Sequence, residues 1–211
     1  GGGYHHQWLN DWWPPVPGSM MMGPDTFVNV NRATRNRLGL FGEWEARWSP
    51  VVTTIAGLRF DQVRVNTGEV QRSGDDRMQM YDGMAAVVFN AADRRRRDDN
   101  WSGSLIAAYQ PSDLVRLELG YARKVRSPNI YERYAWGRGA MSSSMIGWFG
   151  DGNGYVGNLD LKPERADTLG ASIALGGAAA GWSAKISPYY TRVHDYIDAR
   201  FLREFTDMMG M

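Results

Sequence analysis

A two-residue alternation across residues 36–48 (NRLGLFGEWEARW) constrains this chain more than any other feature. Leucine, tryptophan and small residues occupy most even positions, whereas arginine and glutamate occupy most odd ones. Side chains on a strand alternate between its two faces, so one face is apolar and the other is charged. The run is longer than most strands of soluble domains. An apolar outer face opposite a charged inner face is typical of a strand that crosses a membrane in a β-barrel.

The same alternation recurs in five further segments, residues 52–62, 101–109, 114–126, 168–175 and 182–191. The last contains Pro188, which weakens it because proline cannot donate to a strand ladder. We therefore predict six strands with one apolar face each. The residues expected on the convex, lipid-facing side are Leu38, Leu40, Trp44, Leu58, Leu105, Leu117, Leu119, Ile173 and Ile186.

The connections between these segments are alternately short and long. Residues 49–51, 110–113 and 176–181 are rich in Pro, Gly, Ser and Asp, as tight turns are. The segments 63–100 and 127–167 each run to about 40 residues, which is unusual in a compact soluble domain. Outer-membrane barrels have short periplasmic turns and long extracellular loops. We accordingly predict that residues 1–35 form another outer loop and that a further one begins after His194.

The composition excludes several classes of protein. No run of 18 apolar residues is present, so the sequence offers no transmembrane helix. A net charge of +1 does not favour a nucleic-acid partner, and the chain has no cysteine. Nine tryptophans and ten tyrosines suit the aromatic girdles of a barrel in contact with outer-membrane lipid and lipopolysaccharide. Neither a signal peptide nor a closing strand is evident, so we expect part of a longer protein. Alone it would form an open curved antiparallel sheet with unpaired edges.

Two motifs carry a family resemblance. RSPNIYERY (residues 126–134) has the form R-x-P-x-x-x-E-x-Y, and GNLDLKPE (residues 157–164) has the form GN-x-x-L-x-P-E. Both resemble the barrel of TonB-dependent outer-membrane receptors. The resemblance implies an all-β fold in which residues 1–211 supply about six to eight of roughly 22 antiparallel transmembrane strands. It also implies a bacterial outer-membrane location and a contact with the TonB complex through a plug domain that this chain lacks.

A narrower resemblance concerns the transported substrate. WWPPVPGSMMM, the loop with Met141 and Met145, and GDGNGYVGNLDLKPE are similar to the copper-receptor branch of this family. The resemblance implies copper as a transported ligand, with no resident cofactor. No copper-ligand motif of that branch can be matched residue by residue.

The residues themselves offer separate support for copper. All 11 methionines lie outside the six predicted strands. Thioethers are soft ligands that select Cu(I), and imidazoles bind Cu(II). An alternative remains open, since methionine also fills hydrophobic cores and these loops could simply pack over the barrel mouth. The candidate metal ligands are His5, His6, Met20, Met21, Met22, Met141 and Met145.

Other functions fit less well. A ferric-siderophore receptor of the same family is the runner-up, and a passive porin or adhesin barrel would tolerate the same mixed inward charges. We predict no enzyme activity, because His194-Asp195 has no recognisable nucleophile. The G-x-G-x-x-G match at residues 152–157 lacks the strand and helix of a dinucleotide site. Asp151, Asn153 and Tyr155 suggest a turn rather than a calcium loop. Residues 94–97 (RRRR) are expected to form a solvated rim or a contact for lipopolysaccharide phosphates.

Overall fold

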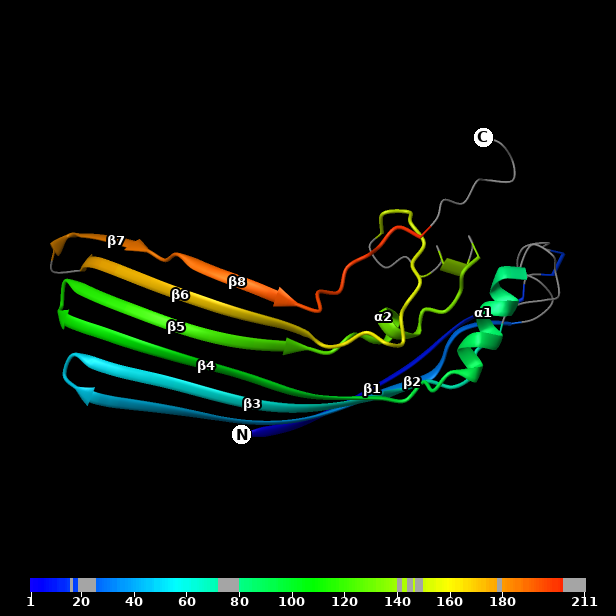
Figure 1. Ribbon diagram of the computed structural model, residues 1–211, viewed down its shortest axis with the longest axis horizontal. Coiled ribbons are helices and arrows are strands. Elements are labelled where there is room, and N and C mark those ends of the chain that lie inside the picture. Colours follow the sequence, from blue (N-terminus) through cyan, green and yellow to red (C-terminus); the bar gives the residue numbers. More distant parts are fainter. Residues whose placement is uncertain are drawn as a thin grey trace.

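The computed structural model describes residues 1–15, 17–18, 26–71, 80–139, 142–143, 146, 150–177 and 180–202. They form one curved antiparallel sheet with two helices at one end (Figure 1). The strands follow each other in the order β1 to β7, and β8 pairs with β6. The all-β, open-sheet prediction is confirmed. The elements are β1 (Gly2–Trp13), β2 (Phe27–Ser49), β3 (Val52–Asn66), α1 (Met80–Ala91), β4 (Arg96–Ser112), β5 (Val115–Arg126), α2 (Ile130–Tyr134), β6 (Glu164–Gly177), β7 (Trp182–Ile186) and β8 (Tyr189–His194).

Four of the six predicted segments are parts of longer strands, residues 114–126 correspond closely to β5, and residues 182–191 cover β7 and part of β8. Short turns join β2 to β3, β4 to β5 and β6 to β7 at one end of the sheet, and the long connections lie at the other end, as expected (Figure 1). The strands extend beyond the apolar band, so the long connections shrink to residues 67–95 and 127–163. The first of these also contains α1, which a two-residue alternation does not predict. Among the described residues, no helix has the length and apolar character needed to span a membrane.

The prediction that residues 1–35 form an outer loop is wrong. They include β1 and the start of β2, which pair from Gly2↔Leu40 to Trp13↔Phe27. The register shifts twice between Leu9 and Trp12, and Arg32 has a positive φ of 48°. Such bulges change which residues face the same side. The apolar alternation is therefore interrupted, and the sequence pattern does not reveal this strand pair.

Pro188 divides the last predicted strand into β7 and β8. The break is local, because the Pro188 carbonyl still accepts a hydrogen bond from the Ala171 N–H of β6 at 3.0 Å. Proline lacks only the backbone N–H donor, and the edge of a sheet tolerates the missing hydrogen bond.

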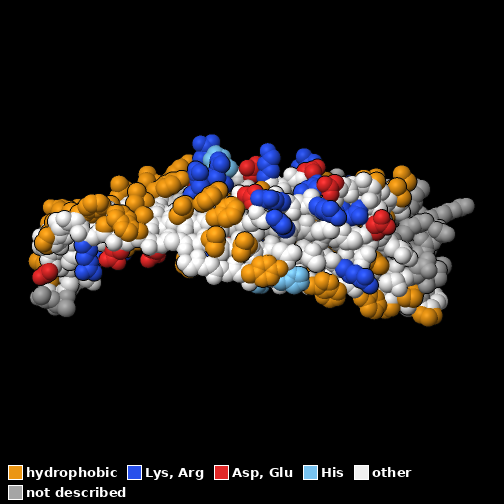
Figure 2. Space-filling model, turned by 90° about the horizontal axis from the view of Figure 1, so that it is seen from below, with side chains coloured by type: hydrophobic (Ala, Val, Ile, Leu, Met, Phe, Trp, Pro, Cys, Tyr) orange, Lys and Arg blue, Asp and Glu red, His pale blue; other side chains and the backbone are white. Residues whose placement is uncertain are grey.

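The register places the apolar side chains on one face across the whole sheet. Leu40 lies opposite Phe60, and Phe60 lies opposite Trp101. All nine predicted lipid-facing residues lie on this face, and between 37% and 68% of each is exposed. Figure 2 shows hydrophobic side chains along the convex contour near the short turns, with acidic side chains on the concave underside. We call the eight strands the wall. The apolar, convex face is its outward face, and the concave face is its inward face.

The hydrophobic core lies at the loop end of the sheet. It joins the ends of β2 and β3 to α1 and to the segment around α2. We call the described residues of 67–95 and 127–163 the loop cap, since they cover the inward side of β2 and β3 there. The buried core residues are Phe27, Val30, Ala33, Val63, Val65, Val70, Ala85, Ala86, Phe89, Ile130, Tyr134 and Trp136.

Candidate functional site in the loop cap and on the inward face

The two sequence motifs bind each other at the base of the loop cap. Arg126 Nη1 donates to both carboxylate oxygens of Glu132 at 3.0 Å, and Arg126 Nε donates to Glu164. Glu132 also closes a capping box with Asn129 at the start of α2, with hydrogen bonds of 2.6 and 2.8 Å. The arginine and glutamates of the motifs thus hold the loop to the ends of β5 and β6. Their role in this structure is to shape the loop.

Gly157 allows the second motif to lie against α2. Its N–H donates to the Ala135 carbonyl at 2.6 Å, and the Asn158 N–H donates to the Glu132 carbonyl at 2.8 Å. A Cβ atom at position 157 would stand 2.7 Å from the Tyr131 carbonyl oxygen. A side chain would separate the two backbones, so glycine is required here.

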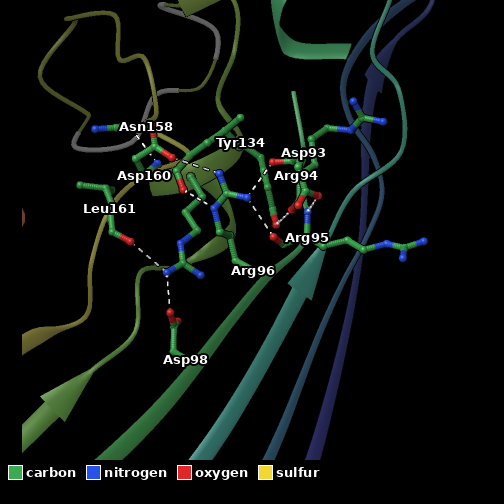
Figure 3. Close-up of polar contacts among 11 residues, drawn as sticks. Asp93, Arg94, Arg95, Arg96, Asp98, Tyr134, Asn158, Asp160 and Leu161 are labelled. Atoms are coloured by element: carbon green, nitrogen blue, oxygen red, sulfur yellow. Dashed lines mark hydrogen bonds and ion pairs between the residues drawn. The ribbon is translucent and has the colours of Figure 1, made fainter. Parts of the chain in front are cut away.

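A buried ion pair joins the loop cap to β4. Arg133 Nη2 lies 2.8 Å from Asp98 Oδ1, and 1% and 7% of these side chains are exposed. The same nitrogen donates to the Leu161 carbonyl at 3.0 Å, and Figure 3 labels both acceptor residues, Asp98 and Leu161. Arg133 Nε and Nη1 and Asp98 Oδ2 are buried without a partner among the described residues. Buried polar atoms of this kind normally bind water or another polar group.

Within the RRRR run, Arg94 and Arg96 are half-buried and bonded to the loop cap, so the solvated-rim prediction is wrong for these two, whereas Arg95 and Arg97 are exposed. Arg94 Nη1 donates to the carbonyls of Phe89, Asn90 and Ala92 at 2.5–3.2 Å and so caps the end of α1. Arg96 bonds the Leu159 carbonyl at 2.8 Å and Asp160 at 3.1 Å (Figure 3). Arg96 also donates to the Asp93 and Arg95 carbonyls at 2.7 and 2.9 Å, so this side chain ties the two long connections together.

Helix α1 is fastened by a buried carboxylate. Asp82 Oδ1 accepts 2.8 Å hydrogen bonds from the N–H groups of Arg138 and Gly139 and from Ser142 Oγ. The opposite side of α1 is apolar. It carries Met84, Val87 and Val88, each of which is about two-thirds exposed.

The inward face of the wall carries charges that largely neutralise each other. Arg37 and Arg59 each donate two hydrogen bonds to Asp61 at 2.6–2.9 Å. Glu118 accepts from Arg116 at 2.8 Å and from Ser172 at 2.9 Å. A polar inward face of this kind suits both a plugged receptor and a water-filled porin.

Of the seven predicted metal ligands, the structure describes only His5 and His6. His5 and His6 belong to β1, not to a loop, and they point to opposite faces because His5 pairs with Arg37 and His6 with Asn36. Trp13, at the loop end, lies eight positions after His5, which is about 26 Å along a strand. Within the described part, no three His, Asp or Glu residues form a group that could hold a metal. Met20, Met21, Met22, Met141 and Met145 lie outside the described residues, and their role stays a prediction.

The turn at residues 151–155 satisfies its own polar groups. Asp151 accepts from the Asn153 N–H and amide group and from Tyr155 Oη at 2.5–3.0 Å. These bonds, led by the Tyr155 hydroxyl, lower the pKa of Asp151. Residues 153–158 are irregular, and the described residues on either side of them, 150–152 and 159–163, contain neither strand nor helix, so the described segment forms no dinucleotide-binding turn.

The comparisons with known proteins agree on the fold. The model of the TonB-dependent receptor-like β-barrel family matches residues 1–207. The chain is similar to the copper transporter OprC, with a TM-score of 0.54 and 21% identity over 82% of this chain and 22% of that one. It is also similar to the Serratia marcescens hemophore receptor HasR, in a complex with its hemophore HasA and heme. The TM-score is 0.58, with 17% identity over 94% of this chain and 31% of that one.

The chain therefore spans less than a third of either solved protein. No curated protein matches it. The match over nearly the whole sequence, together with the open antiparallel sheet, shows that the chain belongs to the TonB-dependent receptor β-barrel family.

Proposed function

We propose that this sheet is part of the wall of a bacterial outer-membrane receptor that takes up copper. A plug domain outside this chain would couple uptake to the TonB complex. Family membership supports the receptor class. The loop cap would then face the outside of the cell, because long connections of such barrels are extracellular and short turns are periplasmic.

The distribution of methionine carries the copper proposal. The sequence has 11 methionines, and none falls within the bounds of the eight described strands. Met80 and Met84 lie in α1, and 64% of Met84 is exposed. Methionine is usually a core residue, so a thioether exposed at the loop end is unusual. Thioether sulfur is a soft ligand that favours Cu(I) over harder metal ions.

The similarity to OprC fits copper, whereas the similarity to HasR favours heme to the same degree. Both identities are low, and one fold serves many substrates. A ferric siderophore is a further alternative, for which we would expect aromatic and arginine side chains around a bulky chelate.

The test uses the full-length receptor that contains this chain, purified in detergent. Copper bound per receptor would be measured by elemental mass spectrometry before and after combined substitution of Met20, Met21, Met22 and Met84 by leucine. Leucine keeps volume and hydrophobicity but removes the sulfur, so ligation is separated from packing. We expect copper affinity to fall at least about tenfold, equivalent to about 1.4 kcal/mol.

A matched control substitutes Val87 and Val88 by leucine, which alters the same exposed side of α1 without changing a sulfur. This control should bind copper like the wild type. Unchanged copper binding in the methionine variant would make these residues packing residues. Tight binding of heme or of a ferric siderophore, with no copper binding, would reassign the substrate within the family.

A further inference from the structure

The outward face of the wall carries arginines at its loop end. Arg64 lies directly opposite Arg97 in the β3–β4 register, and both are exposed. Like charges placed opposite each other on a sheet repel. Arg97 is paired with Asp99 at 2.9 Å, whereas Arg64 makes no hydrogen bond to another described residue. This pair of positions therefore holds positive charge that the described side chains do not fully neutralise.

A second group of arginines surrounds one carboxylate on the neighbouring strands. Asp167 of β6 lies opposite Arg123 of β5 and opposite Arg192 of β8. Arg123 Nε is 2.7 Å from Asp167, and Arg165 Nε is 3.4 Å from it. Arg192 makes no hydrogen bond to another described residue. Asp99 and Asp167 thus face five arginines, which leaves three positive charges on this surface.

The position of these arginines follows the chemistry of a membrane surface. Towards the loop end, β3 presents Leu58, Phe60 and Arg64 on its outward face, and β5 presents Leu119, Tyr121 and Arg123. Each outward sequence thus passes from aliphatic to aromatic to arginine. Aromatic side chains mark the membrane interface. On each strand the arginine lies one or two outward-facing positions beyond the aromatic residue, which is about 7–13 Å along the strand. The arginines therefore lie at the depth of lipid headgroups.

The opposite end of the outward face has no such charge. Among the described strand residues there, Arg47, Arg116 and Lys185 lie on the inward face, whereas Trp44, Tyr109 and Trp182 lie on the outward face. In Figure 2 the Lys and Arg side chains likewise gather beyond the hydrophobic band, towards the loop end. The outward face therefore carries arginines at its loop end only, at the depth of one of the two leaflets.

We propose that Arg64, Arg97, Arg123, Arg165 and Arg192 form a belt that binds the phosphate groups of lipopolysaccharide in the outer leaflet. Guanidinium groups bind phosphate oxygens with two parallel, charge-assisted hydrogen bonds. The belt offers several such groups at one depth, on adjacent strands. This inference rests on the proposed outer-membrane location but does not depend on copper as the substrate.

The test compares lipopolysaccharide binding by two double variants of the full-length receptor. Arg64→Gln/Arg192→Gln removes two guanidiniums that make no hydrogen bond to another described residue. The control, Arg47→Gln/Arg116→Gln, removes the same charge from the inward face. Binding of purified lipopolysaccharide would be measured by native mass spectrometry, alongside the same lipid after enzymatic removal of its phosphates. We expect the outward variant to bind at least about tenfold more weakly, the control to match the wild type, and dephosphorylated lipid to bind the wild type weakly.

Equal binding by the outward variant and the wild type would overturn the proposal, as would equal binding of phosphorylated and dephosphorylated lipid. Inorganic phosphate should not displace the lipid, and displacement at low concentration would make the belt a site for free phosphate. Copper binding measured on the same samples separates the two proposals. A receptor that binds lipopolysaccharide but no copper keeps this inference and loses the substrate proposal.

Discussion

In the loop cap, Tyr134 and Trp136 have almost no exposed surface, whereas Trp44 and Leu119 in the wall are exposed by more than half. The cap residues are held by directed contacts. Trp136 stacks on Phe27 with ring centroids 5.2 Å apart and donates to two carbonyls of β2 at 3.0 and 3.1 Å. The wall side chains on the outward face have few contacts beyond their cross-strand neighbours.

This difference shows which surroundings each region requires. The loop cap buries apolar groups against the strand ends, as a small soluble domain does. The outward face of the wall exposes its leucines and tryptophans, so its favourable surroundings are lipid. The inward face pairs its charges locally, as in the cluster around Asp61. The cap is therefore stabilised by the chain itself, while the wall depends on the membrane and on neighbouring strands.

The largest expected effect is at Trp136. Substitution by alanine should destabilise the loop cap by about 3–5 kcal/mol, because a buried indole is lost and two carbonyls lose their donor. Hydrogen exchange of the α1 and α2 amides would measure this as faster local opening. The matched wall variant Trp182→Ala, in which a 58% exposed ring is removed, should leave these amides unchanged. Equal effects would show that cap and wall are one cooperative unit.

The buried ion pair is the next most sensitive contact. Arg133→Gln should cost about 3–5 kcal/mol of cap stability, since Asp98 would remain buried without its charged partner. Limited proteolysis at the arginine run 94–97 would report the opening. The exposed wall pair offers the control, because Arg116→Gln breaks the bond to Glu118 and should cost about 0–1 kcal/mol. A stable Arg133→Gln variant would mean that the orphaned carboxylate is satisfied by water.

The two faces of the wall can be distinguished on one strand. Leu117→Arg places a charge on the outward face and should cost about 2–4 kcal/mol if the site is near mid-depth in the bilayer. Glu118→Arg changes the inward face and should be much milder, although the bonds to Arg116 and Ser172 are lost. Reversible unfolding of the full-length receptor from lipid vesicles would give both values. A larger cost at Glu118 would reverse the assignment of the faces.

The smallest effect concerns the alkaline titration of the cap. Burial raises the pKa of Tyr134 from 10.0 to about 12, and its hydroxyl donates to the Arg94 carbonyl at 2.6 Å. The folded state thus favours the neutral phenol. Its contribution to stability is complete below pH 10 and is lost as the pH rises through about 12. The difference between the ultraviolet titration curves of the wild type and Tyr134→Phe should isolate the ionisation of Tyr134. Ionisation of this tyrosine already near pH 10 would contradict the prediction.

Much of the wall follows from the sequence alone. The alternation around Leu38, Leu117 and Ile173 identifies the outward face because a strand period of two leaves no other arrangement. Pro- and Gly-rich runs locate the short turns. Where a bulge interrupts the period, as between Leu9 and Trp12, the pattern fails and β1 is not recognised. Helix α1 had a usable signal that the analysis of alternation missed, since Asp82, Ala85, Ala86 and Phe89 recur at helical spacing and are buried.

The loop cap was decided by tertiary structure. The sequence contains Arg126, Glu132 and Glu164 as parts of two motifs, but only folding brings these side chains together across 38 residues. The same holds for Arg133 and Asp98, whose charges look solvated in sequence and are buried in the structure. Periodicity reports the two faces of one strand because neighbouring residues determine them locally. Contacts between loops depend on long-range packing, which no local pattern encodes.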